Sequence, residues 1–125
     1  MKLLIDSHVL IWLLYEPERF SVFGRETLEA AEVVYVSIVS LWELTLKFTK
    51  HKLAYPPDEL AAGVIALQLT ELSIRTEHLQ RLPLIKLSQA DPFDALLIAQ
   101  NEAEGCTLMT ADSLLLQSPY RVIKV

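Results

Sequence analysis

The chain has 125 residues, 52% of them hydrophobic and 3 of them glycine, which is the size of one domain with a single core. Its 11 Lys and Arg and 16 Asp and Glu give a net charge of -5, which argues against binding of nucleic acid through a generally positive surface. Any nucleic-acid contact is therefore expected to be local. The single Cys106 excludes a disulfide framework and a Cys-ligated zinc site.

The apolar stretches are shorter than the roughly 18 residues that a membrane-spanning helix needs. Asp6 and His8 interrupt the apolar N-terminal stretch, which we interpret as part of the fold and not as a signal peptide. We therefore expect a cytoplasmic protein without a membrane segment. The mean hydropathy of +0.33 is high for a small domain and indicates an apolar surface for a subunit or a partner. The candidates for the apolar surface are Trp12, Leu13, Leu14, Tyr15 and Trp42, although core packing is the default expectation for Trp42.

Short apolar runs alternate with longer helical patterns, which is typical of an α/β domain with a largely parallel sheet. No repeat or linker divides the sequence, so residues 1–125 are expected to form a single domain. In chain order, the first half is predicted to form a strand at 2–5, a helix at 9–15, a break at 16–18, a helix at 21–31, a strand at 33–36 and a helix at 39–51.

Proline, aspartate and glycine mark the helix boundaries of the second half. Asp58, which follows two prolines, is predicted to cap a helix that runs to Leu69. Asp91-Pro92 is predicted to begin a helix that Gly105 ends. Cys106, next to the strand that follows, is expected to be a small buried side chain. The remaining predicted elements are a strand at 71–74, a helix at 76–82 and strands at 107–110 and 121–125.

Acidic side chains lie where several of these elements begin or end. Asp6 directly follows the first strand, and Asp112 comes two residues after the strand at 107–110. Glu43 lies near the start of the helix after the second strand, and Asp91 and Asp94 begin the helix that leads into the fourth. Ligand sites of open parallel sheets form beyond the carboxyl ends of the strands. We therefore expect up to five acids to converge at this edge of the sheet.

Such a group of acids has a specific chemistry. Clustered carboxylates raise one another's pKa unless a positive charge neutralises them. Oxygen ligands suit hard divalent cations, of which Mg²⁺ and Mn²⁺ are the candidates. A cation of this kind holds a phosphate oxygen, activates a water and stabilises the charge that develops on phosphorus during displacement. The predicted constellation therefore favours hydrolysis of phosphodiester bonds.

The acids also have structural interpretations. Asp91 is a good helix N-cap, and Asp94 lies in the first turn, where a negative charge is favourable. Asp112 suits a turn. Asp6 stands directly behind three aliphatic residues and would be buried at a cost without a partner. The placement of all the acids at one edge favours the functional interpretation.

Four segments carry a recognisable pattern, namely LIDSHVLIW at 4–12, VSIVSLWEL at 36–44, DPFDALLIAQ at 91–100 and LMTAD at 108–112. In this order they resemble the successive motifs of PIN-domain ribonucleases. Within that family, they are most similar to VapC-type toxins of type II toxin-antitoxin systems. The four segments cover the chain from near its start to residue 112, so the resemblance is specific although each segment alone is a weak signal.

The resemblance implies a three-layer α/β/α sandwich with a mainly parallel central sheet. It implies a toxin that cleaves RNA as a Mg²⁺- or Mn²⁺-dependent endoribonuclease, forms a homodimer and is held inactive by a cognate antitoxin. Ser40 and Thr110 would be hydroxyls that support the acids or contact phosphate. The catalytic metal ligands that the motifs imply are Asp6, Glu43, Asp94 and Asp112, with Asp91 as a further acid.

Some positions lie outside this pattern. In this group of toxins a His usually precedes the Asp-Pro-Phe-Asp segment and an Arg follows it, whereas this chain has Gln89 and Ala95. Neither position is a core metal ligand, so the expected activity stands, although RNA positioning near this helix is expected to differ. His8 and His78 have no evident partner, and both are interpreted as structural.

The chain has one clear basic cluster. Lys47 and Lys50 follow Glu43 by four and seven residues on one helical face, with His51 and Lys52 beyond. We hypothesise that Lys47 neutralises Glu43 or the scissile phosphate, and that Lys50 and Lys52 contact the RNA backbone. There are two simpler alternatives. In one, the lysines mark a solvated helix end, where the helix dipole alone favours cations, and in the other, Lys47 forms a surface pair with Glu43.

Two other functions are compatible with acids at strand ends. A phosphoryl-accepting receiver domain has a similar size, but it predicts an acidic pair after the first strand, where this chain has Asp6 followed by Ser7. A non-cleaving PIN-like module would bind RNA or a partner protein without hydrolysis. The presence of all four expected acids favours cleavage over this alternative.

Overall fold

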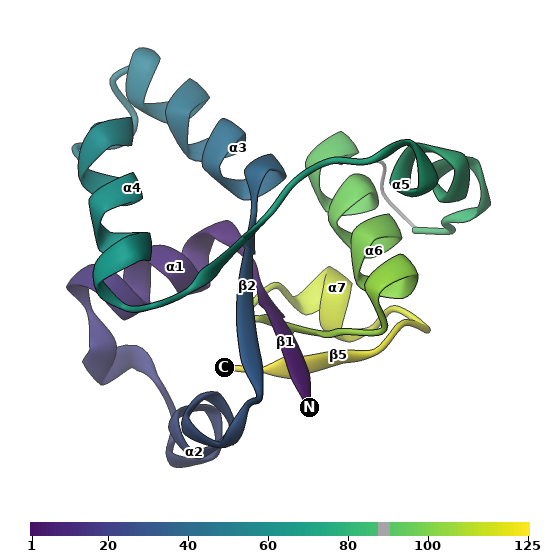
Figure 1. Ribbon diagram of the computed structural model, residues 1–125, viewed down its shortest axis with the longest axis horizontal. Coiled ribbons are helices and arrows are strands. Elements are labelled where there is room, and N and C mark those ends of the chain that lie inside the picture. Colours follow the sequence, from purple (N-terminus) through teal and green to yellow (C-terminus); the bar gives the residue numbers. More distant parts are fainter. Residues whose placement is uncertain (88–90) are drawn as a thin grey trace.

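The computed structural model describes residues 1–87 and 91–125 and contains one five-stranded sheet (Figure 1). The strand order is β3-β2-β1-β4-β5, and every neighbouring pair is parallel. The strands are β1 (Lys2–Ile5), β2 (Val33–Ser37), β3 (Thr70–Leu72), β4 (Thr107–Thr110) and β5 (Val122–Lys124). All the expected strands are therefore confirmed, although β3 begins one residue earlier and ends two residues earlier than predicted.

The helices follow the predicted order. They are α1 (Ser7–Tyr15), α2 (Val22–Ala30), α3 (Ile38–Thr49), α4 (Pro57–Ala66), α5 (Thr76–Arg81), α6 (Pro92–Glu104) and α7 (Ser113–Leu116). Short 3-10 turns at Pro17–Arg19 and Leu82–Leu84 follow α1 and α5. Helix α7, of four residues, was not predicted. No helix in the described ranges is long and apolar enough to cross a membrane.

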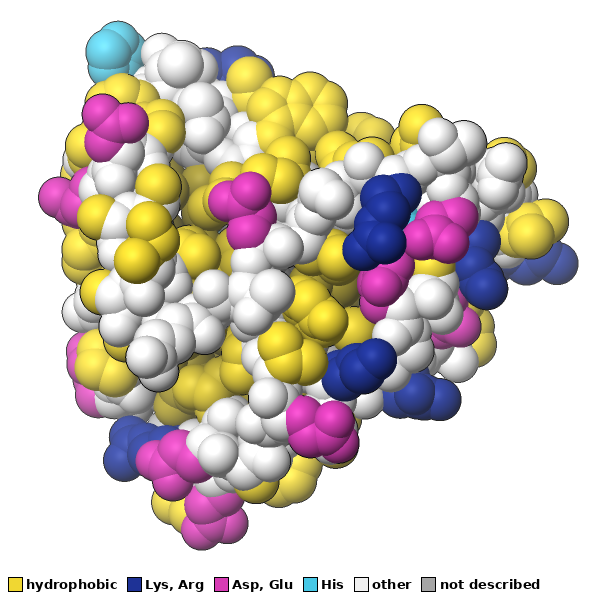
Figure 2. Space-filling view, in the orientation of Figure 1, with side chains coloured by type: hydrophobic (Ala, Val, Ile, Leu, Met, Phe, Trp, Pro, Cys, Tyr) yellow, Lys and Arg dark blue, Asp and Glu magenta, His cyan; other side chains and the backbone are white. Residues whose placement is uncertain are grey.

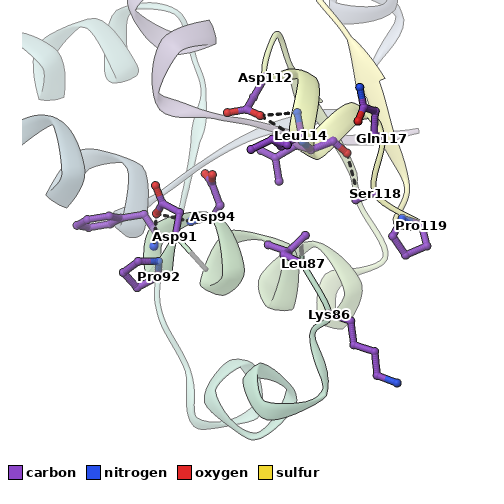
Figure 3. Close-up of a pocket in the computed structure, with 12 residues that line it drawn as sticks. Lys86, Leu87, Asp91, Pro92, Asp94, Asp112, Leu114, Gln117, Ser118 and Pro119 are labelled. Carbon is purple, nitrogen blue, oxygen red and sulfur yellow. Dashed lines mark hydrogen bonds between the residues drawn. The ribbon is translucent and has the colours of Figure 1, made fainter. Parts of the chain in front are cut away.

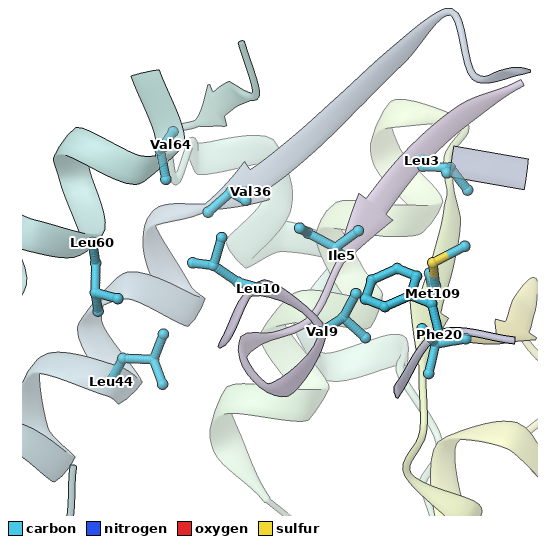
Figure 4. Close-up of a cluster of buried hydrophobic side chains, with 11 residues drawn as sticks. Leu3, Ile5, Val9, Leu10, Phe20, Val36, Leu44, Leu60, Val64 and Met109 are labelled. Atoms are coloured by element: carbon cyan, nitrogen blue, oxygen red, sulfur yellow. The ribbon is translucent and has the colours of Figure 1, made fainter. Parts of the chain in front are cut away.

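Helices cover both faces of the sheet. Successive side chains of a strand point to opposite faces, so consecutive apolar residues need packing partners on both. Leu3 and Ile5 of β1 pack in a cluster with α1, α3 and α4, which Figure 4 shows. Leu4, which points to the opposite face, packs in a second cluster with α6 and α7. Cys106 is buried in this second cluster, as expected, although β4 begins one residue after it. The expected three-layer α/β/α sandwich is confirmed.

The prediction that Asp58 caps α4 is wrong. Pro56 occupies the N-cap position, no side chain caps the helix, and Asp58 lies in its first turn. Pro57 suits the first helical position, because its fixed φ fits a helix and its missing N–H would have no partner within the helix. The helix also ends at Ala66 rather than Leu69, because Gln68 adopts a left-handed conformation with φ of 57°.

His78 has partners that were not evident from the sequence. It is fully buried, and its Nδ1 accepts a hydrogen bond from the Arg75 backbone N–H at 3.0 Å. Its Nε2 therefore carries the proton and donates to Glu104 Oε2 at 2.9 Å. This pair joins α5 to α6, and sequence spacing does not show it because the partners are 26 residues apart.

A second buried link joins α3 to α6. The Ser37 hydroxyl at the end of β2 donates to Gln100 Oε1, and it accepts from the Val39 backbone N–H at 3.0 Å as the N-cap of α3. Gln100 Nε2 donates to the Ser73 carbonyl at 3.2 Å. Because α3 carries Glu43 and α6 carries Asp94, this link sets the relative position of two acids.

The apolar surface lies elsewhere than expected. Residues 12–15 of α1 are half-buried and pack against the first core cluster instead of forming an open patch. The largest exposed apolar side chains in the described ranges include Val22, Phe23, Ile65 and Leu84. Figure 2 shows broad apolar areas on one face of the molecule, interspersed with acidic and basic side chains and without a continuous basic surface. The local charge pattern therefore agrees with the net charge of -5.

Candidate functional site

The predicted acids meet beyond the carboxyl ends of the central strands. The chain proceeds from β1 outward to β2 and β3 and then returns to β4 on the other side, so strand order reverses between β1 and β4. Asp6 follows β1 directly, and Asp112 follows β4. Ligands of open parallel sheets bind at such a reversal point. The fold therefore places these two carboxylates at the favoured position for a site.

Asp6 is buried and tightly held. Its Oδ1 accepts the Val9 backbone N–H at 2.9 Å, which makes Asp6 the N-cap of α1, and its Oδ2 accepts the Thr110 hydroxyl. Burial raises the pKa of the Asp6 carboxyl above its usual value, and the hydrogen bonds from Thr110 and Val9 oppose this effect. Thr110 also accepts the Asp112 backbone N–H at 3.0 Å, so one buried hydroxyl connects two of the acids.

Asp91 and Asp112 cap helices as well as line the site. Asp91 Oδ1 accepts backbone N–H groups of Phe93 and Asp94 at 2.8 and 3.2 Å at the start of α6. Asp112 Oδ1 accepts those of Leu114 and Leu115 at 2.9 and 3.2 Å at the start of α7. Figure 3 shows the carboxylates of Asp91, Asp94 and Asp112 gathered between these two helix starts. The capping and functional interpretations are therefore compatible, because each cap uses one oxygen of a carboxylate.

Glu43 reaches the same site from α3. Its Oε1 accepts the Ser7 hydroxyl at 2.8 Å, and its Oε2 lies 3.9 Å from Lys47 Nζ. The expected pair four residues apart on α3 is therefore present. Ser40, one turn before Glu43, is buried.

These groups line one cleft of about 190 Å³. Lys47 is the one Lys or Arg among the described residues that line it, against five carboxylates. The lining residues are Asp6, Ser7, His8, Val39, Ser40, Glu43, Lys47, Asp91, Phe93, Asp94, Leu97 and Asp112. The structure thus brings together all five predicted acids, and Ser40 and Lys47 with them.

The pKa of Asp94 reflects both its burial and the negative charge of the cleft. Burial raises its pKa from the ordinary value of 3.8 to about 7, and four neighbouring carboxylates contribute to the increase. In decreasing order of effect, these are Asp91, Asp112, Glu43 and Asp6. Around neutral pH the cleft therefore holds a carboxyl that is only partly ionised, and a divalent cation would favour its ionised form.

Several residues of the cleft were not predicted, or were predicted wrongly. Ser7 and His8 line it, although the sequence indicated no role for Ser7 and a structural one for His8. Trp42 is 51% exposed, so the expected core packing is wrong. It contacts the ring of Phe93 edge to face, with ring centroids 5.0 Å apart. Its position next to Glu43 on α3 turns it outward at the rim, because Ser40 and Leu44 occupy the buried face.

The other predicted positions lie outside the cleft. Lys50 and Lys52 are exposed at and beyond the end of α3 and do not line the cleft. Ala95 lies in the first turns of α6 and is half-buried. Gln89 lies outside the described residues.

Glu77, His78 and Glu104 form another group with the composition of a metal site, with ligand atoms within 4.8 Å of one another. These side chains already have partners within the protein. Arg75 lies 3.7 Å from Glu77 and 3.8 Å from Glu104, and His78 bonds to Glu104. We interpret this group as the contact that fastens α5 to α6.

The sequence matches the family model of the PIN domain over residues 3–117. The chain therefore belongs to the PIN domain family, as the four motifs predicted. No curated protein sequence matches the chain.

Solved structures of toxin-antitoxin systems share the fold. VapBC2 from Rickettsia felis bound to a promoter DNA fragment gives a TM-score of 0.74 at 12% identity, covering 99% of this chain and 98% of that chain. DNA-bound VapBC from Salmonella typhimurium gives 0.72 at 16% identity, with coverage of 99% and 98%. VapBC-5 from Mycobacterium tuberculosis, a member of the VapBC family of toxin-antitoxin systems, gives 0.62 at 14% identity, with coverage of 99% and 97%.

Proposed function

We propose that this PIN domain is a VapC-type toxin of a type II toxin-antitoxin system and hydrolyses RNA as a divalent-metal-dependent endoribonuclease. The observation that carries the proposal is the convergence of five carboxylates on one cleft, where burial and, after it, the neighbouring carboxylates raise the pKa of Asp94 to about 7. A carboxyl whose pKa is shifted this far by burial and by neighbouring charges is typical of functional sites.

The residues of the cleft fit a hard divalent cation, Mg²⁺ or Mn²⁺. Carboxylate oxygens are the preferred ligands of these ions, and Lys47 alone does not balance five carboxylates. When bound, such an ion supplies Lewis-acid polarisation of the phosphate and a more acidic water. The proposed catalytic ligands are Asp6, Glu43, Asp94 and Asp112, with Asp91 as a further acid.

Hydroxyl groups hold the proposed ligands in place. Thr110 connects Asp6 to the backbone of Asp112, and Ser7 donates to Glu43, so three acids arrive in the cleft with fixed orientations. We assign Ser40, which is buried and lines the cleft, a supporting or phosphate-contacting role. Because these side chains are already held in place before a ligand binds, less free energy is needed to reorganise them during binding and reaction.

Lysine side chains supply the positive charge for the substrate. Lys47 lies 3.9 Å from Glu43 and lines the cleft, where its ammonium group can meet the scissile phosphate. Lys50 and Lys52 continue from α3 outside the cleft, in a position to contact the flanking RNA backbone. The resulting contact with RNA is local, in agreement with the net charge of -5.

The proposed partners are a cognate antitoxin and a second copy of the chain. The three solved structures named above are of VapBC systems, which supports an antitoxin partner in the cytoplasm. A helix of the antitoxin would bury exposed apolar side chains, and a basic side chain on it would complement the acidic cleft. The same exposed apolar side chains support a homodimer.

The test of the proposed function is cleavage of RNA by the purified chain, freed of antitoxin, with Mg²⁺ or Mn²⁺ and then with EDTA. We expect cleavage with the metal, and cleavage at least about 100-fold slower for Asp6→Asn and Asp94→Asn. Circular dichroism verifies that both variants fold. Asp58→Asn, which removes a carboxylate on α4 outside the cleft, is the matched control and should cleave like the wild type.

Two outcomes would contradict this assignment. Full cleavage by both cleft variants would show that the five acids are not the site. Metal binding by the wild-type chain without cleavage of any RNA would favour the non-cleaving PIN-like module.

A further inference from the structure

A chain of buried polar side chains runs from α5 through α6 to the start of α3. Its members are His78, Gln100 and Ser37, all fully buried. Gln100 Nε2 lies 3.4 Å from His78 Nδ1, which joins the pair of His78 with Glu104 and the link of Ser37 with Gln100 into one chain. Figure 1 shows α6 between α5 and the start of α3, the three elements that this chain connects. The proposed function does not yet use His78.

The direction of each hydrogen bond in this chain is fixed. The Arg75 backbone N–H can only donate, so His78 Nδ1 is an acceptor. The Ser73 carbonyl, 3.2 Å from Gln100 Nε2, is an acceptor as well, so both groups require the nitrogen of the amide on their side. The amide oxygen therefore points to the Ser37 hydroxyl. One tautomer of His78 thus sets the orientation of the Gln100 amide.

The link of Ser37 with Gln100 joins two elements that carry acids of the acid cleft, the cleft that the five carboxylates line. Ser37 caps α3, which carries Glu43, and Gln100 lies on α6, which carries Asp94 in its first turn. Apolar contacts of Val39 also hold α3 against α6, but apolar contacts are not directional. The hydrogen bonds therefore supply the directional part of this packing.

We propose that His78, although it lies outside the acid cleft, is a positioning residue for the proposed metal site. Its Nδ1 holds the Gln100 amide in one orientation, and the amide holds Ser37 at the start of α3. The carboxylates of Glu43 and Asp94 then approach the same space from α3 and α6. The inference rests on the proposed function and adds to it a residue that does not line the cleft.

A simpler role for His78 is to fasten α5 to α6 through Glu104. The two ring nitrogens separate these roles, because Nδ1 faces Gln100 and Nε2 faces Glu104. An asparagine side chain at this position offers an amide oxygen near the place of Nδ1 but does not reach Glu104. A glutamine side chain puts its amide nitrogen near the place of Nε2 and offers no acceptor near that of Nδ1. His78→Asn and His78→Gln are therefore a matched pair, each of which keeps one half of the contacts of the ring.

The test is calorimetric titration of the full chain with Mn²⁺ at pH 7.5, with urea denaturation of each variant to measure its stability. We expect His78→Gln to weaken Mn²⁺ binding by about threefold to tenfold, and His78→Asn to bind within about twofold of the wild type. Each variant loses a buried contact, so both should unfold at a lower urea concentration than the wild type. A difference between them in metal affinity therefore reports positioning and not a general loss of stability.

Two controls establish where Mn²⁺ binds. Glu104→Gln removes a carboxylate from the group of Glu77, His78 and Glu104, and it should leave the Mn²⁺ affinity unchanged because the ion binds in the acid cleft. His51→Asn, at an exposed position beyond α3, controls for the loss of an imidazole. Gln100→Leu removes the same directional bonds without a change at His78, and it should weaken Mn²⁺ binding as much as His78→Gln does. It keeps the test decisive if His78→Gln does not fold.

The outcomes separate this inference from the proposed function. Equal Mn²⁺ affinity of the two His78 variants, or weaker binding by His78→Asn than by His78→Gln, would overturn the inference and leave His78 as a fastening of α5 alone. Weaker binding by Glu104→Gln would also overturn it, because the effect would then pass through Nε2. Absence of Mn²⁺ binding by the wild type would contradict the proposed metal site itself, and this inference with it.

Discussion

Single carboxylates in this protein combine a structural and a chemical role. Asp6, Asp91 and Asp112 each use one oxygen to cap a helix while lining the acid cleft. The cap holds the carboxylate at a helix start, where backbone N–H groups and the helix dipole favour negative charge. Capping therefore favours the ionised form of three of the five acids in the cleft. Because the same carboxylates cap helices and line the cleft, the sequence alone could not distinguish a capping role from a functional role.

The raised pKa of Asp94 makes the free energy of unfolding depend on pH. Its pKa is about 7 in the folded protein and near 3.8 in the unfolded chain. Between these values the folded protein holds a proton that the unfolded chain has released, so the free energy of unfolding falls as the pH rises through this window. Burial raises the pKa of Asp6 as well, which acts in the same direction.

We therefore predict that Asp94→Asn stabilises the metal-free protein at pH 8 by about 1 kcal/mol, after allowance for solvent screening. The difference should be much smaller near pH 4, where Asp94 is protonated in the folded protein and only about half ionised in the unfolded chain. Urea denaturation in EDTA at the two pH values measures it, with Asp58→Asn as the control for loss of a carboxylate outside the cleft. A variant less stable than the wild type at pH 8 would show that burial and the neighbouring acids do not disfavour the charge on Asp94.

Among single residues, the acids of the cleft were predictable from the sequence, whereas the side chains that hydrogen-bond to them were not. Asp6 and Asp112 follow directly from the ends of apolar strands, and Glu43 from its place after the second strand. The hydrogen bond from Ser7 to Glu43 joins residues 36 apart, and no local pattern encodes it. The outward position of Trp42 was missed because it depends on which side of α3 faces the sheet.

At the scale of elements, the site depends on how α3 lies against α6. Besides apolar contacts of Val39 with Leu96 and Ala99, the buried link from Ser37 to Gln100 sets this arrangement. Ser37 caps α3, and Gln100 lies two turns beyond Asp94 on α6. Buried polar groups of this kind cost free energy when one partner is removed.

Ser37 and Gln100 should therefore be energetically coupled. We predict that Ser37→Ala and Gln100→Leu each destabilise the protein by about 1–3 kcal/mol, because each leaves a buried partner unsatisfied. The double variant should be less destabilised than the sum of the two by about 1 kcal/mol. Urea denaturation of the four proteins gives the coupling energy. Strict additivity would mean that the link contributes nothing to the packing of α3 on α6.

Elements with strong local signals were predicted well. The β-branched run of β2 and the Asp91-Pro92 start and Gly105 end of α6 are examples, and Gly105 has the positive φ of 65° that such an ending requires. The four-residue α7 was missed because its length is below what a periodic pattern can reveal. The start of α4 was misplaced because two consecutive prolines replaced the expected side-chain cap.

At the scale of the whole molecule, the charge of -5 and the proposed action on RNA are compatible because positive charge is local. Lys47, Lys50 and Lys52 lie along the last turns of α3 and just beyond them. The acidic cleft itself would need a cation before it could receive a phosphate. The charge distribution thus favours a local contact with RNA, as proposed, over binding through a generally positive surface.

RNA affinity should accordingly depend only moderately on salt. With three lysines on phosphates, the slope of log affinity against log salt for single-stranded RNA should be about -2, and the double variant Lys50→Ala, Lys52→Ala should have a slope of about -0.7. Fluorescence anisotropy between 50 and 300 mM KCl measures both slopes. A slope several times steeper, or one that the double variant leaves unchanged, would place the RNA on another surface.

The most direct test of the central claim is calorimetric titration of the purified chain with Mn²⁺ at pH 7.5. If the five carboxylates form a metal site, the wild type and Asp58→Asn should bind Mn²⁺ with equal affinity, and Asp94→Asn should bind it at least about tenfold more weakly. Binding to the wild type should also weaken below pH 7, because Asp94 must release its proton. Equal affinity of Asp94→Asn and the wild type for Mn²⁺ would contradict the assignment of the cleft as a metal site.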